Sequence, residues 1–144
     1  MGDWSLRPAT VADIEALVEL RAVVMRPDLE RLGRFDEHRV RQRLRDGFVP
    51  ANSWVIEVGG DLAGCVALRP ADDGHWLEHF YLSPTFQGHG IGSAVLSHLL
   101  LGCTVVRLIV LQGSPARRLY ERLGFTVEAQ DPVDVVMVRS TVGS

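Results

Sequence analysis

A short glycine-rich segment near the middle of the chain constrains its fold more than any other feature. Residues 87–92 read Gln-Gly-His-Gly-Ile-Gly, with a glycine at every second position. An apolar run, Phe80–Leu82, precedes this segment, and an apolar pattern with helical spacing follows it over residues 91–101. A strand, a loop and a helix start in this order form a site for an anion such as phosphate, because the first helical turn has free N–H groups and lies at the positive end of the helix dipole. Glycines let the backbone approach such an anion closely.

The spacing of these glycines excludes two well-known nucleotide-binding loops. A dinucleotide-binding fold needs Gly-x-Gly-x-x-Gly after its first strand and an acidic residue about 20 positions later, and neither is present. A Walker loop needs a lysine, and the chain contains none. A plain strand-to-helix turn, with glycines only for tight packing, remains the alternative interpretation.

Length and composition predict one globular domain that spans residues 1–144. No apolar stretch approaches the ~20 residues of a membrane span, and we expect no membrane partner. The net charge of −3 argues against nucleic-acid binding. Cys65 and Cys103 lack metal-ligand spacing, so we expect buried free thiols, no metal site and a reducing, cytoplasmic location. The first residues do not form a secretory signal.

All fifteen basic side chains are arginines, and they are unevenly distributed. Residues 21–46 hold eight arginines against five acidic residues, which leaves the remainder of the chain at −6. Arginine stays charged and can hold a carboxylate or phosphate with two hydrogen bonds. Two interpretations are open: solvated helix faces, or a docking surface for an anionic acceptor.

Periodicity predicts a mixed sheet with helices on both faces. The first helix follows Thr10 and is interrupted at Pro27; one or two arginine-rich helices then end near Gly47. Val105–Leu111 is rich in β-branched residues and predicts a strand buried on both faces. Ser114 and Gly124 are expected to cap the ends of the last helix. The expected strands are 4–7, 53–58, 62–68, 76–82, 105–111, 125–129 and 133–138, and turns are expected at 59–61 and 70–74.

Two segments resemble the conserved motifs of the GNAT superfamily, the acetyl-CoA-dependent N-acetyltransferases. Residues 87–92 match the pattern Gln/Arg-x-x-Gly-x-Gly/Ala of its motif A. Residues 114–125, Ser-Pro-Ala-Arg-Arg-Leu-Tyr-Glu-Arg-Leu-Gly-Phe, closely resemble motif B, whose core is Ala-x-x-Leu-Tyr-x-x-x-Gly-Phe. The predicted order of elements matches the family over nearly the whole chain.

This resemblance implies a mixed α+β fold: a mainly antiparallel sheet of six to seven strands, flanked by about four helices and splayed between the fourth and fifth strands. Acetyl-CoA would lie in the splay, with pantetheine along the strand that ends at Leu82 and pyrophosphate on the amides of residues 88–93. The family often has an asparagine where this chain has Gln112-Gly113-Ser114, so Ser114 or Gln112 would have to replace it. The implied cofactor-binding residues are Phe80, Tyr81, Leu82, Gln87, Gly88, His89, Gly90, Ile91, Gly92, Ser93, Ser114, Ala116 and Tyr120.

The resemblance also points to candidate catalytic residues. Tyr120 matches the motif B tyrosine, which often donates a proton to the CoA sulfur; packing alone is the alternative. The acceptor amine must lose a proton before it attacks, and Glu78 and His79 are the candidate bases. Because they are adjacent on a strand, regular pleating lets only one of them face the cleft. For either residue a structural role is equally open.

The acceptor is expected between residues 25–48 and residues 131–134. A carboxylate on it could meet Arg26, Arg31 or Arg34, whereas a cationic amine could meet Asp131 or Asp134. A small-molecule amine is the preferred acceptor. The alternatives are a protein or peptide acceptor, and a non-catalytic sensor that binds acyl-CoA. Homodimers are common in the family, and a homodimer is an expectation that the residues themselves do not test.

Overall fold

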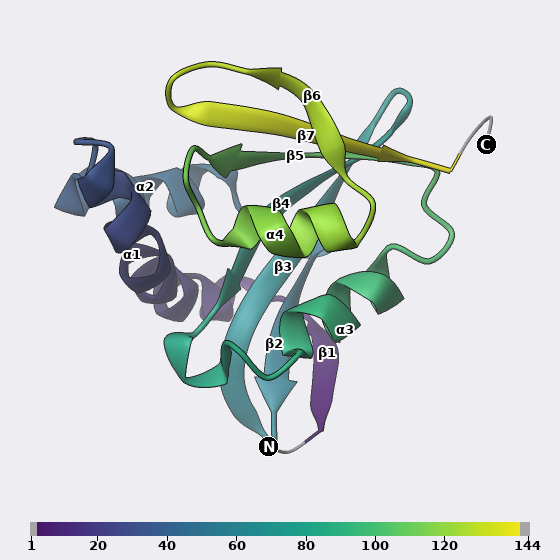
Figure 1. The fold of residues 1–144 in the computed structure, drawn as a ribbon. Helices are drawn as coiled ribbons and strands as arrows, with labels where there is room; N and C mark the ends of the chain where they lie inside the picture. Colours follow the sequence, from purple (N-terminus) through teal and green to yellow (C-terminus); the bar gives the residue numbers. More distant parts are fainter. Residues whose placement is uncertain (1–2, 142–144) are drawn as a thin grey trace.

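In the computed structural model, which describes residues 3–141, the chain forms one seven-stranded sheet with helices on both faces (Figure 1). The strand order is β1-β2-β3-β4-β5-β7-β6, and every neighbouring pair is antiparallel except β4 and β5. This is the fold class implied by the family resemblance. The strands are β1 (Trp4–Pro8), β2 (Ser53–Val58), β3 (Asp61–Ala71), β4 (Gly74–Leu82), β5 (Val105–Leu111), β6 (Thr126–Gln130) and β7 (Asp134–Ser140).

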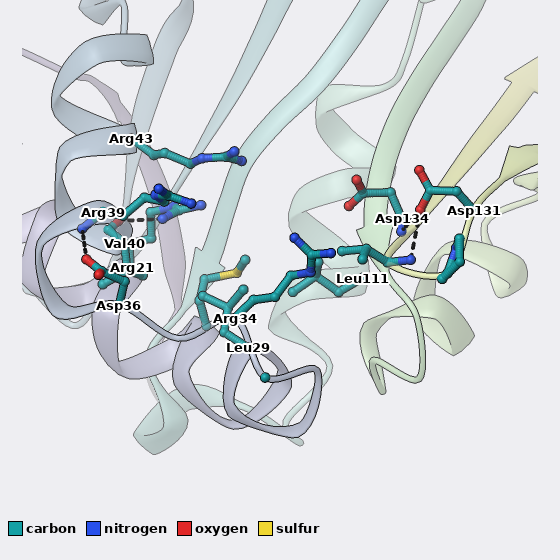
Figure 2. A pocket seen from close by; sticks show the side chains of 14 residues that line it. Arg21, Leu29, Arg34, Asp36, Arg39, Val40, Arg43, Leu111, Asp131 and Asp134 are labelled. Atoms are coloured by element: carbon teal, nitrogen blue, oxygen red, sulfur yellow. Dashed lines mark hydrogen bonds between the residues drawn. The ribbon is translucent and has the colours of Figure 1, made fainter.

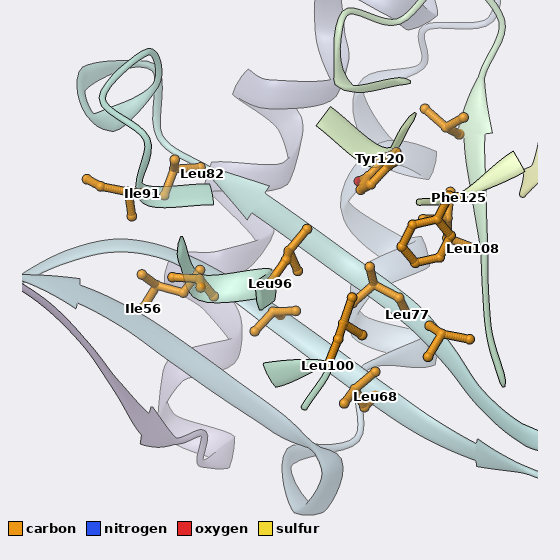
Figure 3. Close-up of a cluster of buried hydrophobic side chains, with 14 of the residues drawn as sticks. Ile56, Leu68, Leu77, Leu82, Ile91, Leu96, Leu100, Leu108, Tyr120 and Phe125 are labelled. Carbon is orange, nitrogen blue, oxygen red and sulfur yellow. The ribbon is translucent and has the colours of Figure 1, made fainter. Parts of the chain in front are cut away.

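Four α-helices divide between the two faces of the sheet. One core lies beneath α3 and α4 and contains Leu96, Leu108 and Phe125 (Figure 3). The other lies beneath α1 and α2 and contains Leu17, Leu44 and Tyr81. The helices are α1 (Ile14–Arg31), α2 (Glu37–Gly47), α3 (Ile91–Leu99) and α4 (Ala116–Arg122), with short 3₁₀ turns at Val11–Asp13, Pro50–Asn52 and Pro84–Phe86.

The interruption predicted at Pro27 is wrong, because α1 continues through this proline to Arg31. Proline removes one backbone donor from a helix, yet the helix can continue where packing on either side holds it. Here the face of α1 that includes Leu17 and Val18 is fully buried against the sheet, and Arg31 at the end of the helix contacts the carbonyl of Gln112. Tertiary contacts therefore override the local signal.

Two further predictions about strands were wrong. The turn expected over residues 70–74 is shorter, because β3 extends to Ala71 and β4 begins at Gly74. The expectation that β5 is buried on both faces also fails. Val106, Leu108 and Val110 are buried, whereas Ile109 on the opposite face is 57% exposed. That face borders a cavity, which its apolar sequence did not reveal.

The parallel strands β4 and β5 are paired at one end only. Their register consists of two residue pairs, His75 with Val106 and Trp76 with Arg107, and the strands then diverge (Figure 1). Gly74 permits the close contact at this end, because a Cβ there would lie 2.0 Å from the carbonyl oxygen of Val105. The predicted splay is therefore present, and it leaves one edge of β4 without a strand partner beyond Trp76.

Candidate active site

A bulge in β4 determines which side chains face the cleft. The register between β3 and β4 shifts between Cys65 and Ala67, and His79 has a left-handed φ of 48°. Leu77 packs into the core beneath α3 and α4, so Glu78 lies on the opposite face. The bulge then keeps His79 on that same face, beside Phe48 and Tyr81. The expectation that only one of Glu78 and His79 borders the cleft is wrong, because both line it.

The loop between β4 and α3 carries a run of free backbone donors. Within residues 3–141, the six N–H groups from Gly88 to Ser93 donate to no acceptor. Gly88 and Gly90 both have φ of 78°, and a Cβ at either would meet nothing within 4 Å. Packing therefore does not explain these two glycines, whereas the left-handed backbone does. The arrangement fits a multiply charged anion such as pyrophosphate.

Packing does explain the third glycine of the loop. A Cβ on Gly92 would lie 3.3 Å from Cζ of Phe80 and 3.4 Å from Cδ2 of Leu119. The side chain of Gln87 has a structural role as well, because its Nε2 donates to the carbonyl of Leu82 at 2.8 Å. That bond ties the loop to the end of β4 and holds the free amides in place.

A cavity of about 440 Å³ lies against this loop and against the start of α4. His89 does not border it and is exposed to solvent. Tyr81 borders the neighbouring cavity instead. Gln112 borders neither of these two cavities, since its side chain binds Gln130 and the carbonyl of Asp131. Eleven of the thirteen residues expected at the cofactor line the 440 Å³ cavity: Phe80, Leu82, Gln87, Gly88, Gly90, Ile91, Gly92, Ser93, Ser114, Ala116 and Tyr120.

Tyr120 stands between this cavity and the cleft of the splay, and it lines both. Its ring contacts Phe125 edge-on, with 6.0 Å between the centroids, and its hydroxyl points away from that ring (Figure 3). The hydroxyl makes no hydrogen bond to any other residue that the structure describes. Burial raises the pKa of Tyr120, so the phenol is protonated at neutral pH. An available proton donor is therefore held at the cleft.

Glu78 forms an ion pair within the cleft wall. Arg69 Nε donates to Oε1 at 2.8 Å, and a terminal nitrogen of the same guanidinium lies 3.3 Å from Oε2. A carboxylate has about four acceptor positions, so the pair leaves about two for water or an amine. The side chain is one-third exposed, which gives water access to it.

His79 is half-buried in the same cleft wall. Burial lowers the pKa of His79, so its ring is neutral at pH 7. Its Nδ1 lies 3.5 Å from the hydroxyl of Tyr81, and Gly47 lies beside its Nε2, since a Cβ on that glycine would be 3.4 Å away. Tyr81 Oη in turn accepts from Nε of the buried Arg21 at 2.9 Å. The imidazole is thus held within a polar network beneath the cleft.

A third cavity, of about 600 Å³, lies beyond the splay (Figure 2). Residues from α1, α2 and the loop between them form one wall, and the turn between β6 and β7 forms another. The structure therefore brings together the two segments expected to select an acceptor. Of the three predicted arginines, only Arg34 lines this cavity. Arg26 pairs with Glu30 and Glu37, and Arg31 pairs with Asp28.

Sequence reasoning missed three arginines of this cavity: Arg21, Arg39 and Arg43. A signal for Arg21 was present, because it lies three residues after Val18 and four after Leu17, on the buried stripe of α1. Asp131 and Asp134 lie on the opposite wall, as predicted. Two backbone N–H groups, from Val133 and Asp134, hold the pKa of Asp131 below its usual range.

The three cavities adjoin one another through shared wall residues. Tyr120 and Phe80 line both the loop cavity and the cleft, which has a volume of about 340 Å³. Arg21, Arg43 and Asp134 line both the cleft and the large cavity. The path thus runs from free backbone amides, past a phenol, to a chamber with charged walls.

Residues 50–127 match the family model described as an acetyltransferase (GNAT) domain. The chain belongs to the GNAT acetyltransferase family. It is therefore an acyltransferase, and acetyl-CoA is its cosubstrate. A search of the curated proteins finds no match.

Solved structures of acetyltransferases share the fold. PaiA N-acetyltransferase from Thermoplasma acidophilum, in complex with coenzyme A, is 20% identical with a TM-score of 0.77, over 96% of this chain and 99% of that one. The ribosomal-protein-S18-alanine N-acetyltransferase from Escherichia coli is 16% identical with a TM-score of 0.74, over 99% and 96%. N-acetylglutamate synthase from Neisseria gonorrhoeae, with coenzyme A and N-acetyl-glutamate, is 22% identical with a TM-score of 0.67, over 97% of this chain but 35% of that one.

The described residues were also compared with the requirements of a membrane-spanning helix, a metal site and a disulfide. No helix within 3–141 is long and apolar enough to cross a membrane. No cluster of three or more His, Cys, Asp or Glu side chains in that range has the geometry of a metal site. Cys65 is a buried free thiol, as predicted, whereas Cys103 is only half-buried.

Proposed function

We propose that this domain transfers an acetyl group from acetyl-CoA to the amine of a small molecule, with both substrates bound at once. The continuous path of cavities, joined at Tyr120 on one side and at Arg21 on the other, carries the proposal. It would let acetyl-CoA and an acceptor enter from opposite ends and meet in the splay. The same domain would supply every residue of the reaction.

The free amides from Gly88 to Ser93 would hold the pyrophosphate, because they combine unpaired donors with the positive end of α3. The unpaired edge of β4, from Phe80 to Leu82, would bind pantetheine through its backbone. The hydroxyl of Ser114 already accepts from the amide of Ala116 at 3.3 Å, just before α4 begins. Its contribution to the cofactor would therefore come from its position in the cavity wall.

Tyr120 would act as the general acid. The amine nitrogen attacks the thioester carbonyl, the carbon–sulfur bond breaks, and the departing thiolate takes the phenolic proton. The acylated nitrogen then releases its extra proton, which restores the phenol of Tyr120. A hydroxyl without a protein partner is suited to this role, because no existing hydrogen bond must break first. A backbone N–H on the free edge of β4 would stabilise the developing oxyanion.

Glu78 would remove the proton from the acceptor ammonium, directly or through one water. It borders the cleft and keeps unused acceptor positions, whereas both nitrogens of His79 already have neighbours. We expect Glu78→Gln to lower kcat by about 100-fold, because an amide cannot take up the proton of the ammonium group. His79→Asn is the comparison, because asparagine tolerates the left-handed φ of this position. If His79→Asn lowers kcat by this much and Glu78→Gln does not, the base is His79.

The acceptor would be a small molecule because the 600 Å³ chamber falls within the usual range of ligand pockets, ~300–1,000 Å³. The decisive experiment measures acetyl-CoA-dependent thiol release, with product mass, for amino acids, diamines, aminoglycosides and peptides. Transfer to a small amine supports the proposal. Transfer to peptides alone identifies a protein or peptide acetyltransferase. Tight CoA binding without transfer to any amine contradicts the enzyme and favours a sensor.

A further inference from the structure

The large cavity gathers arginine side chains that form no ion pair among the described residues. Eight of the fifteen arginines form ion pairs with carboxylates within 4 Å, and they account for every ion pair in residues 3–141. Seven arginines have no such partner in that range. Four of the seven line this one cavity: Arg21, Arg34, Arg39 and Arg43.

Arg21 is the most constrained of the four. Its side chain is on the buried face of α1, and the residue is only 7% exposed. Its Nε donates to the hydroxyl of Tyr81, and one terminal nitrogen donates to the carbonyl of Val40. Both partners are neutral, so the charge itself is not compensated. Burying an uncompensated charge is costly, and an anion in the adjoining cavity would reduce that cost.

Arg39 and Arg43 lie one turn apart on α2, and the Arg43 side chain points into the cavity (Figure 2). Arg34 approaches from the loop after α1 and lies between the two walls in the same view. The nearby Asp36 offsets only part of this charge: its carboxylate caps α2 by accepting from the amide of Arg39 at 2.7 Å and attracts the Arg39 guanidinium, so four guanidiniums share one carboxylate on this wall.

The opposite wall carries negative charge. Asp131 lies in the turn between β6 and β7 and Asp134 begins β7 (Figure 2). Neither has a guanidinium within 4 Å among the described residues. Guanidinium and carboxylate groups thus face each other across the chamber without forming ion pairs within 4 Å. A molecule with an anionic group and an ammonium group matches this separation.

We propose that the acceptor is an amine that also carries an oxyanion, a carboxylate or phosphonate, which the guanidiniums of Arg21, Arg39, Arg43 and Arg34 bind. Its ammonium group would face Asp134, which lines both the chamber and the cleft. Arg21 and Arg43 also line both spaces, so an anion on them lies within a short molecule's length of the reacting amine. The inference rests on the proposed function, since it takes this chamber to be the acceptor site.

The test measures binding separately from turnover. Calorimetry on the CoA-loaded protein would compare amino acids with their amides, which keep the amine but lose the negative charge. Aminoalkylphosphonates and diamines complete the set. We expect amino acids or aminoalkylphosphonates to bind at least ~10-fold more tightly than amides and diamines, because hydrogen bonds between charged groups are the stronger ones. The better of the two anionic series identifies the oxyanion.

Arg43→Gln is the informative variant, because the side chain is exposed and unpaired and the fold does not depend on it. It should weaken binding of the anionic acceptor by ~10- to 100-fold and leave binding of the amide unchanged. Arg45→Gln is the control: it lies on the same helix, pairs with Glu15 and lines none of the three cavities. CoA affinity should not change in either variant.

The inference is overturned if neither anionic series binds more tightly than the amides, if diamines bind more tightly than both series, or if Arg43→Gln and Arg45→Gln respond alike. Absence of binding by every anionic member would overturn it as well. Acetyl transfer is scored independently. An enzyme that acetylates only neutral or cationic amines refutes the anionic acceptor and leaves the proposed function intact, whereas anion binding without any transfer refutes the proposed function alone.

Discussion

Replacement of Gly90 by alanine separates a binding role of the β4–α3 loop from a structural one. Gly90 precedes α3 with φ of 78°, and Gly59 in the β2–β3 turn has φ of 59°. A Cβ at either position meets nothing within 4 Å. Alanine therefore adds backbone strain but no clash at both sites. The left-handed conformation costs an L-residue about 1–2 kcal/mol, and a stiffer unfolded chain offsets part of that.

The two variants should lose equal stability and unequal affinity. We expect each to lower the free energy of unfolding by about 1 kcal/mol, which lowers Tm by roughly 3 °C in a chain of this size. Only Gly90 lies within the run of six free amides. If strain turns one of these amides away from the pyrophosphate, one hydrogen bond to a charged group is lost, worth about 1.5–3 kcal/mol. Gly90→Ala should then bind CoA ~10- to 100-fold more weakly.

Calorimetric titration of CoA into the wild-type protein, Gly90→Ala and Gly59→Ala provides the comparison, and thermal melts of the free proteins verify the matched strain. Unchanged CoA affinity in Gly59→Ala together with the loss in Gly90→Ala is the predicted result. If both variants bind CoA as the wild type does, the amides of this loop do not hold the pyrophosphate, and the reasoning is refuted.

Three further predictions concern stability. Arg7 lies 2.8 Å from Asp13 and lowers the pKa of that carboxyl to about 2, so this ion pair stabilises the fold above pH 4 and is lost as the pH falls toward 2. Asp13→Asn should cost about 1 kcal/mol in urea unfolding at pH 7 and almost nothing at pH 2; equal losses would contradict this. Gly74→Ala should cost at least about 2 kcal/mol, against about 1 for the unobstructed Gly60→Ala, because its Cβ would lie 2.0 Å from the carbonyl of Val105. Burial lowers the pKa of His79, so wild-type stability should fall as the pH drops from 6.5 to 5, and His79→Asn should flatten that slope; an unchanged slope would exclude His79 as its source.

Local signals in the sequence predicted those parts of the site that a short segment determines. The loop from Gln87 to Gly92 and the start of α3 depend on neighbouring residues, and both lie where their glycines indicate. The last helix follows the same rule in part: Pro115 rather than Ser114 is its N-cap, although the Ser114 hydroxyl accepts from the amide of Ala116, and Gly124 follows its end with φ of 96°. Eleven of the thirteen expected cofactor residues therefore line one cavity.

The bulge in β4 could not be predicted from the sequence. The bulge is a shift of one residue in the β3–β4 register opposite Val66. No glycine or proline lies at that position of β4 to indicate it. His79 adopts the left-handed conformation although histidine seldom does. The expectation of a regular strand therefore placed Glu78 and His79 on opposite faces, whereas in the structure both line the cleft.

The arginines of the large cavity were also beyond local reasoning. Charge density over residues 21–46 left both solvated helix faces and an anion-docking surface open, because it did not distinguish paired from unpaired guanidiniums. Arg26 and Arg31 are engaged by carboxylates nearby in sequence, so they are unavailable. Arg39 and Arg43 face the cavity because α2 packs its Val40 and Leu44 inward, a rotation that only the packed helix reveals.

Steady-state kinetics of Tyr120→Phe test the central claim most directly. This substitution removes one hydroxyl, which has no hydrogen-bond partner among the described residues, so stability and CoA affinity should stay within about 0.5 kcal/mol of the wild type. Thiol release at saturating acetyl-CoA and acceptor should fall by about 100-fold or more if the phenol protonates the departing thiolate. An unchanged kcat in a folded variant that binds CoA normally would contradict the account, and Tyr120 would then serve only to pack against Phe125.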